Sequence, residues 1–261
     1  MKRSFLVVTC LFLLCSGSLL AQAPVVSSGG VVNGASFRPS AASGGGVAPG
    51  SIISIFGTNL ARSIAGASAL PLPTTLVGTS VTMAGRPVPL FFVSPNQINA
   101  QVPWAAATGS STLTVTTAAG ASAPAAVTIS AFSPGIFAQA SNGRGPGAIQ
   151  NWVTETNTPL NDFSIAAPVN GMLIIYATGL GAVQNPPADG AAGSGQRTVN
   201  TVSATIGGRT VTAEFAGLTP GFAGLYQVNA RVPSSTAPGN EAPLFLLIGG
   251  RISNTVTLAV R

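Results

Sequence analysis

The chain has 261 residues, of which 46% are hydrophobic and only 6% are charged, and its formal net charge is +6. Its 32 Gly and 20 Pro are typical of a β-sandwich with many turns, while the hydrophobic content favours a packed core over low-complexity coil. The arginines are spread singly, without the basic run that would track a phosphate backbone, which argues against nucleic acid as a partner. Disorder is expected only in patches such as residues 40–46 and 188–196.

The N-terminus has the order of charges and apolar residues found in secretory signal peptides. Two basic residues precede an apolar run from Phe5 to Leu14, and small and polar residues follow it. A run of about ten residues is half of the roughly 20 needed to span a bilayer, so no stable membrane span is expected after cleavage. We predict a signal peptide at residues 1–21 with cleavage after Ala21, because Pro24 would hinder a cut after Ala23.

Loss of the signal peptide would remove both cysteines, and the chain has no histidine. The mature protein would then have no disulfide, so its cores must be large enough to hold the fold unaided. It would also lack the usual zinc, copper and iron ligands and the histidine base of a catalytic triad. We therefore expect no metal, no cofactor and no catalytic residue.

The remaining chemistry is carried by five acidic residues. A glycosidase needs two carboxylates that flank the scissile bond, and Glu155 and Asp162 share one loop-like stretch. Because the spacing of these two residues is not diagnostic of a glycosidase, we interpret them as solvated loop charges. Asp189 stands alone, whereas calcium sites usually draw several acidic residues from one loop.

The most informative pattern is an internal repeat. Residues 85–103 (GRPVPLFFVSPNQINAQVP) match residues 208–233 (GRTVTAEFAGLTPGFAGLYQVNARVP) at both ends, and ISIFGTNL, ending at Leu60, matches LIIYATGL, ending at Leu180. The offsets of 120 to 130 residues are close to one sandwich domain of roughly 100 residues. The repeat predicts two tandem sandwich domains, at residues 24–131 and 132–261.

Each copy has the period of two that is typical of β-strands. Polar and apolar residues alternate at 112–116, 127–129 and 255–258, which places one face of each strand in a core. Gly207-Gly208 and Gly249-Gly250 lie between such runs, as in two-residue hairpins with positive φ. Short strands without a sustained helical stripe predict an all-β fold of two tandem sandwiches.

Several segments resemble a known family. They include VVNGASFRP, VAPGSIISIFGTNLA, SPGIFAQ, IIYATGLGAV, FAGLTPGFAGLYQVNARVP and SNTVTLAVR. Together they resemble the Solibacter-type C-terminal domain family, which is itself similar to IPT/TIG immunoglobulin-like domains. The resemblance implies exported bacterial modules with immunoglobulin-like sandwiches and no assigned activity, and it carries over no functional residue.

A row of polar side chains recurs in both copies and is the candidate site. Its members alternate with apolar residues, so they should face outward if the apolar set faces the core. They could pair across strands or contact the other domain, or they could form a docking face for a protein or glycan. The row consists of Gln97, Asn99, Gln101, Gln227, Asn229 and Arg231.

Aromatic residues could add a platform on which sugar rings stack, although most aromatic side chains belong to cores. The candidates are Trp104, Trp152, Phe91, Phe92, Phe222 and Tyr226. Trp152 lies in a polar stretch, and it alone is expected to be exposed.

These features favour an exported, non-catalytic interaction module that binds an extracytoplasmic protein or polysaccharide through loops and a polar sheet face. Its location would be the periplasm, the cell surface or the medium. The alternative is a structural cell-surface or spacer component without a specific ligand. An enzyme is the third and least favoured hypothesis.

The first prediction concerns export. The mature protein should begin at or near Gln22, which the intact mass of the exported chain would show. A mature form that retains Lys2 and Arg3 would contradict both the cleavage and the absence of cysteine that follows from it.

Overall fold

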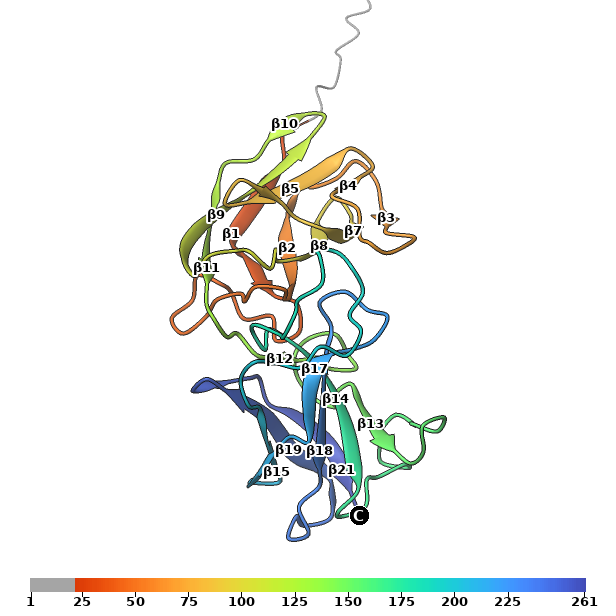
Figure 1. The fold of residues 1–261 in the computed structure, drawn as a ribbon. Coiled ribbons are helices and arrows are strands. Elements are labelled where there is room, and N and C mark those ends of the chain that lie inside the picture. Colours follow the sequence, from red (N-terminus) through yellow and green to blue (C-terminus); the bar gives the residue numbers. More distant parts are fainter. Residues whose placement is uncertain (1–21) are drawn as a thin grey trace, which may run out of the picture.

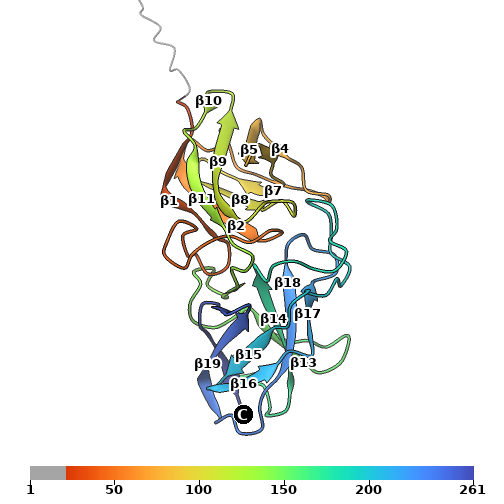
Figure 2. The same cartoon turned by 60° about the vertical axis from the view of Figure 1, so that its left-hand side comes forward.

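The computed structural model describes residues 22–261, and within them every named strand pairing is antiparallel and no helix occurs. The predicted signal peptide at residues 1–21 lies outside the described residues. In the part that is described, no helix could cross a membrane. The strands form two lobes stacked end to end (Figure 1), and a view turned by 60° shows the same stacking (Figure 2). The all-β prediction is confirmed.

The N-terminal lobe contains strands β1 to β11 in two sheets. One sheet has the order β1-β2-β8-β7-β3, and the other has the order β10-β9-β5-β4 with β11 beside β9 and β6 beside β5. The strands are β1 (Val25–Asn33), β2 (Ile52–Thr58), β3 (Ala65–Gly66), β4 (Thr75–Leu76), β5 (Thr79–Met83), β6 (Arg86–Pro87), β7 (Leu90–Val93), β8 (Gln97–Gln101), β9 (Gly109–Thr117), β10 (Gly120–Ala121) and β11 (Ala125–Ile129).

The C-terminal lobe contains strands β12 to β21, also in two sheets. The first has the order β12-β14-β18-β17 with β13 beside β14, and the second has the order β16-β15-β19-β20 with β21 beside β19. The strands are β12 (Gly135–Ile136), β13 (Ile149–Trp152), β14 (Met172–Thr178), β15 (Ser203–Ile206), β16 (Arg209–Thr212), β17 (Phe215–Leu218), β18 (Tyr226–Arg231), β19 (Gly239–Ile248), β20 (Arg251–Ile252) and β21 (Val256–Val260).

Each lobe has its own hydrophobic core between its two sheets. In the N-terminal lobe, Ile55 and Ile98 from one sheet join Val81 and Leu113 from the other in a single buried cluster. A second cluster is built from both sheets of the C-terminal lobe. The alternating sequence pattern explains both cores, because every second side chain of a strand points to the same face. The two sandwiches are the predicted fold class, whereas the boundaries at residues 24–131 and 132–261 stay a prediction.

The internal repeat corresponds to the same strand pairing in both lobes. Ile55 of β2 pairs with Ile98 of β8, and Ile175 of β14 pairs with Val228 of β18. These pairs stand at the offsets of 120 and 130 residues that the sequence shows. The matched segments are therefore equivalent central strands.

The two predicted Gly-Gly hairpins are confirmed. Gly207 and Gly208 connect β15 to β16 with φ of 55° and 79°, and Gly249 and Gly250 connect β19 to β20 with φ of 53° and 72°. Positive φ at both central residues defines the tight turn that matches the twist of antiparallel strands, and glycine adopts it without steric cost.

Where the lobes meet, buried polar side chains satisfy backbone groups of both lobes. Thr178, the last residue of β14, accepts a hydrogen bond from the Ile52 N–H at 2.8 Å and donates to the Gly224 carbonyl at 3.1 Å. Asn33, the last residue of β1, donates to the Ser133 carbonyl at 2.7 Å. Both side chains are fully buried, so these bonds replace the water that the strand ends would otherwise need.

A loop of the C-terminal lobe reaches across the junction and lies against the N-terminal lobe. The Gly190 carbonyl accepts from the Leu72 N–H at 2.9 Å, and Asp189 Oδ1 accepts from the Trp104 N–H at 2.7 Å. The prediction of disorder at residues 188–196 is therefore wrong. The composition of this loop is typical of coil, but its backbone is held by partners that are distant in the sequence.

The second prediction concerns the independence of the lobes. We expect residues 24–132 to fold alone, because their core draws only on residues of that fragment. Residues 133–261 should be β-rich but less stable, because Trp104 and Phe132, which pack against the C-terminal core, are left on the other fragment. Circular dichroism and proton NMR of both fragments measure this. Fragments that are soluble only when mixed would contradict the two-domain division.

Candidate functional site

The polar row on β8 and β18 shows the predicted alternation. The apolar side chains between its members are fully buried in the two cores. Gln97 and Asn99 on β8 are partly exposed, as are Gln227 and Asn229 on β18. These four amides thus face outward, and their role in binding a partner stays a prediction.

In each lobe the glutamine of the row donates to the asparagine two residues further on. The distance from Gln97 Nε2 to Asn99 Oδ1 is 2.8 Å, and that from Gln227 Nε2 to Asn229 Oδ1 is also 2.8 Å. Ser54 Oγ on β2 donates to Asn99 Oδ1 as well, at 2.9 Å. Among the hydrogen bonds of residues 22–261, none uses the side-chain oxygen of Gln97 (Oε1) or the side-chain nitrogen of Asn99 (Nδ2). An acceptor and a donor therefore remain free on neighbouring amides.

Gln101 differs from the rest of the row, because it is fully buried at the junction of the lobes. Its Oε1 accepts from the Gly190 N–H at 2.7 Å, and its Nε2 lies 3.5 Å from the Gly50 carbonyl. The outward orientation predicted for Gln101 is therefore wrong. The physical reason is that the C-terminal lobe covers this end of β8, so the side chain makes the contact between domains that the sequence left open as an alternative.

Arg231 ends the row on β18 and forms an ion pair on the surface. Its Nε lies 2.7 Å from Glu214 Oε1, and both side chains are about half exposed. Arg231 also donates to the Asn170 carbonyl at 3.1 Å. Exposed pairs of this kind contribute roughly 0–1 kcal/mol to stability, so the pair orders the strand end more than it stabilises the fold.

A pocket of about 480 Å³ covers the two outward amides of β8, and we call it the β8 pocket. Gln97 and Asn99 lie beside three aromatic rings, from Phe37, Phe56 and Phe137. The ring centroids of Phe37 and Phe56 are 6.3 Å apart, with planes inclined by 30°. Phe37 and Phe56 belong to the N-terminal lobe, whereas Phe137 follows β12 in the C-terminal lobe. The pocket therefore exists only because the two lobes meet.

A second, mostly apolar pocket of about 330 Å³ shares Phe137 with the first, and we call it the Phe222 pocket. Tyr176, Phe222 and Leu225 line it. Burial raises the pKa of Tyr176, and its hydroxyl donates to Gln150 Oε1 at 2.9 Å. We call the aromatic and amide side chains that line these two pockets the aromatic-amide surface. They are Phe37, Phe56, Gln97, Asn99, Phe137, Tyr176 and Phe222.

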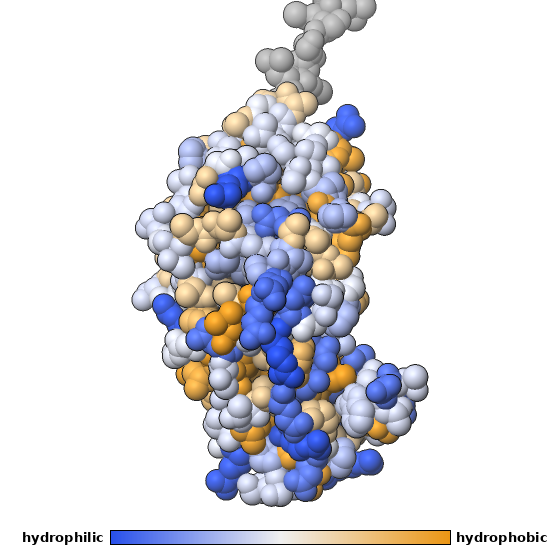
Figure 3. Space-filling model, in the orientation of Figure 1, coloured by the Kyte–Doolittle hydropathy of each residue, from blue (hydrophilic) through white to orange (hydrophobic). Residues whose placement is uncertain are grey.

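The face seen in Figure 3 has no single apolar patch that dominates it. Hydrophobic residues gather at the level of the junction, and a band of hydrophilic residues runs beside them onto the C-terminal lobe. The pockets of the aromatic-amide surface combine rings with neutral amides, a combination typical of small-molecule and sugar sites, where rings supply area and polar groups fix orientation.

The aromatic candidates have different environments. Trp152 is 46% exposed, as predicted, but Phe222 is 56% exposed, so the expectation that Trp152 alone is exposed is wrong. Tyr226 is fully buried, donates to the Gly181 carbonyl, and has a raised pKa because of that burial. Trp104 packs against the C-terminal core. Phe222 lies between two glycines with positive φ, Gly221 and Gly224, and this loop signal could have indicated its exposure.

Asp162 has the surroundings of a loop charge. Asp162 Oδ1 accepts hydrogen bonds from the Ser164 hydroxyl at 2.7 Å and from the Ile165 N–H at 2.8 Å. The bond from Ser164, followed by those from the backbone, lowers the pKa of Asp162. Asp162 therefore closes its own turn. Across residues 22–261, no group of three His, Cys, Asp or Glu residues is placed to hold a metal ion.

Comparison with known proteins identifies one domain. Residues 36–131 match the IPT/TIG domain family, which includes most of the N-terminal lobe. No curated protein matches the chain. The resemblance of the whole chain to the Solibacter-type family stays a prediction.

Solved structures with a similar fold cover most of the chain at low similarity. SGBP-B of a mixed-linkage glucan utilization locus of Bacteroides ovatus, in complex with a mixed-linkage heptasaccharide, is 15% identical with a TM-score of 0.36, over 82% of this chain and 43% of that one. SGBP-B of a xyloglucan utilization locus of Bacteroides uniformis is 13% identical with a TM-score of 0.26, over 91% and 49%. Domains 5-6 of the S-layer protein SbsC are 12% identical with a TM-score of 0.27, over 91% and 98%. The chain spans less than half the length of the two SGBP-B proteins, and at these scores none of the likenesses bears on its ligand.

The third prediction separates the buried amide from the exposed ones. Gln101→Leu should lower the free energy of unfolding by about 1–3 kcal/mol, because the Gly190 N–H loses its buried acceptor. Gln97→Leu is the matched control on the same strand. Because the Gln97 amide is partly exposed, its loss should change the free energy of unfolding by less than about 0.5 kcal/mol. Urea unfolding of both variants measures the difference. Equal effects would show that Gln101 does not support the junction.

Proposed function

We propose that the protein is an exported, non-catalytic module that binds a neutral polysaccharide on the aromatic-amide surface. The observation that carries this proposal is the free side-chain donor of Asn99 and acceptor of Gln97, which line the same pocket as three phenylalanine rings. Aromatic rings provide flat apolar area with little loss of side-chain entropy. Amide groups can bond two neighbouring hydroxyls of one sugar at the same time.

The shape of the surface supports a polymer over a single sugar. The β8 pocket and the Phe222 pocket each have a volume in the range of ligand sites, and they adjoin at Phe137. An extended chain could place successive sugar units in both pockets. Export rests on the signal peptide predicted at residues 1–21, and a non-catalytic role rests on the missing histidine base.

A structural spacer without a ligand is the second candidate, and the position of Gln101 favours it. Gln101 belongs to the polar row, but its side chain bonds the facing lobe at Gly190. If the whole row served only such contacts, the amides of β8 would be as buried as Gln101, but Gln97 and Asn99 are partly exposed.

The fourth prediction tests the aromatic-amide surface. The exported chain should bind a neutral oligosaccharide on a glycan array, and Asn99→Ala should weaken that affinity about tenfold, because it removes one hydrogen-bonding group of the site. Isothermal titration calorimetry measures both affinities. Phe222→Ala should also weaken binding, since it removes an exposed ring from the second pocket.

Two matched controls accompany these variants. Asn229→Ala changes the equivalent asparagine of the other lobe, which lies outside both pockets. Trp152→Ala removes an exposed ring at the end of β13, which also lies outside them. Neither should change the affinity more than twofold. An affinity that neither Asn99→Ala nor Phe222→Ala changes, or an array on which no glycan binds, would favour the structural spacer.

A further inference from the structure

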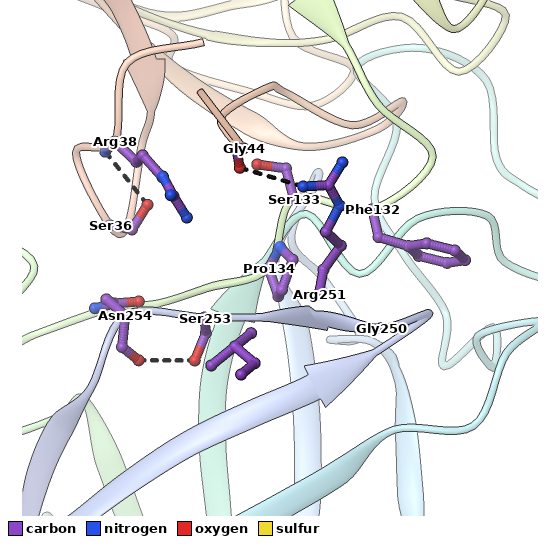
Figure 4. Close-up of a pocket in the computed structure, with 11 residues that line it drawn as sticks. Ser36, Arg38, Gly44, Phe132, Ser133, Pro134, Gly250, Arg251, Ser253 and Asn254 are labelled. Atoms are coloured by element: carbon purple, nitrogen blue, oxygen red, sulfur yellow. Dashed lines mark hydrogen bonds between the residues drawn. The ribbon is translucent and has the colours of Figure 1, made fainter. Parts of the chain in front are cut away.

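A third pocket, of about 430 Å³, opens on the junction of the two lobes and shares no lining residue with the aromatic-amide surface. Arg38 enters it from the loop between β1 and β2. Arg251 enters it from the hairpin of β19 and β20, and the segment of residues 132–134 that connects the lobes lies between them. Figure 4 shows Gly44 between Arg38 and Arg251, with Ser133 and Pro134 beside Arg251.

Both guanidinium groups converge on one backbone position. Arg38 Nη2 lies 3.3 Å from the Ser43 carbonyl, and Arg251 Nη1 lies 3.5 Å from the neighbouring Gly44 carbonyl. A Cβ atom added to Gly44 would stand 3.4 Å from Arg38 Nη2 and 3.7 Å from Arg251 Nη1. Two positive charges from distant parts of the sequence are therefore held beside the same small space.

No acidic side chain balances these charges. The ion pair recorded for residues 22–261 joins Arg231 to Glu214, and none of the residues that line the pocket is acidic. A guanidinium group has five N–H donors in a planar fork. The side chains of Arg38 and Arg251 each make one bond to a backbone carbonyl within the described chain, so most of their donors remain available.

Convergent guanidinium groups are suited to an oxyanion. Like charges repel when they share a site, and an anion between them removes that repulsion and gains charge-assisted hydrogen bonds. The fork of arginine matches the two oxygens of a carboxylate or sulfate group. Arg38 and Arg251 are both exposed, so such a group could reach them from solvent.

The rest of the pocket is suited to the ring that carries the anion. Phe132, Pro134 and Ile252 supply apolar surface, and Ile252 is 55% exposed. The Phe132 ring is itself packed against the C-terminal lobe, since Cβ atoms on Gly249 and Gly181 would stand 2.3 Å and 2.8 Å from it. Pro134 and the exposed Ile252 therefore offer the apolar contact, while the arginines offer charge.

We propose that Arg38 and Arg251 bind the carboxylate or sulfate group of an acidic sugar residue, so that this pocket is a site for an anionic polysaccharide. The site is separate from the aromatic-amide surface and does not depend on it. Because its residues come from both lobes, a bound anion would also connect them.

The experiment uses the mature chain, with binding followed by calorimetry and by the melting temperature. The probes are sodium sulfate against sodium chloride at equal ionic strength, trigalacturonate, the neutral sugar maltotriose, and polyglutamate. We expect sulfate and trigalacturonate to raise the melting temperature, and trigalacturonate to bind with an affinity that falls as sodium chloride is added.

Arg38→Gln and Arg251→Gln should each weaken trigalacturonate binding at least about tenfold, because each removes charge-assisted bonds to the anion. Arg209→Gln is the matched control, since Arg209 follows a Gly-Gly hairpin as Arg251 does but lies outside the pocket. It should change the affinity less than twofold. All three arginines are exposed, so the variants should fold with unchanged melting temperatures in the absence of ligand.

Three results would overturn the proposal. The first is the absence of any response to sulfate and trigalacturonate, and the second is an equal loss of binding in Arg209→Gln, which would indicate attraction by net charge alone. The third is binding of polyglutamate without binding of trigalacturonate, which would assign the pocket to an acidic protein. Binding of maltotriose that Asn99→Ala abolishes concerns the other surface, so the two proposals fail separately.

Discussion

The arrangement of this protein depends on how buried backbone groups are satisfied where the two lobes meet. Thr178 and Gln101 provide hydrogen-bond partners for main-chain groups of strands and loops that water no longer reaches. A buried N–H or carbonyl without a partner costs about 1–3 kcal/mol, so these contacts restrict the lobes to one mutual position. The pockets at the junction exist because that position is fixed.

The repeat explains why similar residues have different surroundings. Gln101 and Arg231 occupy matching ends of β8 and β18, yet one is fully buried and the other forms an exposed ion pair. The lobes are stacked end to end, so this end of β8 faces the other lobe and the matching end of β18 faces solvent. Asn99 likewise differs from Asn229, because Phe137 of the facing lobe completes a pocket over it.

Because the chain has few charged residues, each arginine has few neighbouring charges that compete for a charged ligand. Both cores are built from apolar strand faces, and the exposed ion pair contributes little to stability. The charged side chains are therefore not needed to hold the fold, and they can bind a ligand instead. The two proposed sites use different chemistry, rings and neutral amides in one and guanidinium groups in the other, so they would select glycans of different charge.

The sequence by itself determined the all-β fold, the Gly-Gly hairpins, the repeat and the outward face of four amides. Each of these follows from local periodicity or from residues within one strand pair. Only the tertiary structure decided that Gln101 is buried, that the loop of residues 188–196 is ordered, and that Arg38 meets Arg251. These outcomes depend on contacts between residues some 80 to more than 200 positions apart, and no pattern within a strand encodes which end of one sandwich will cover the other.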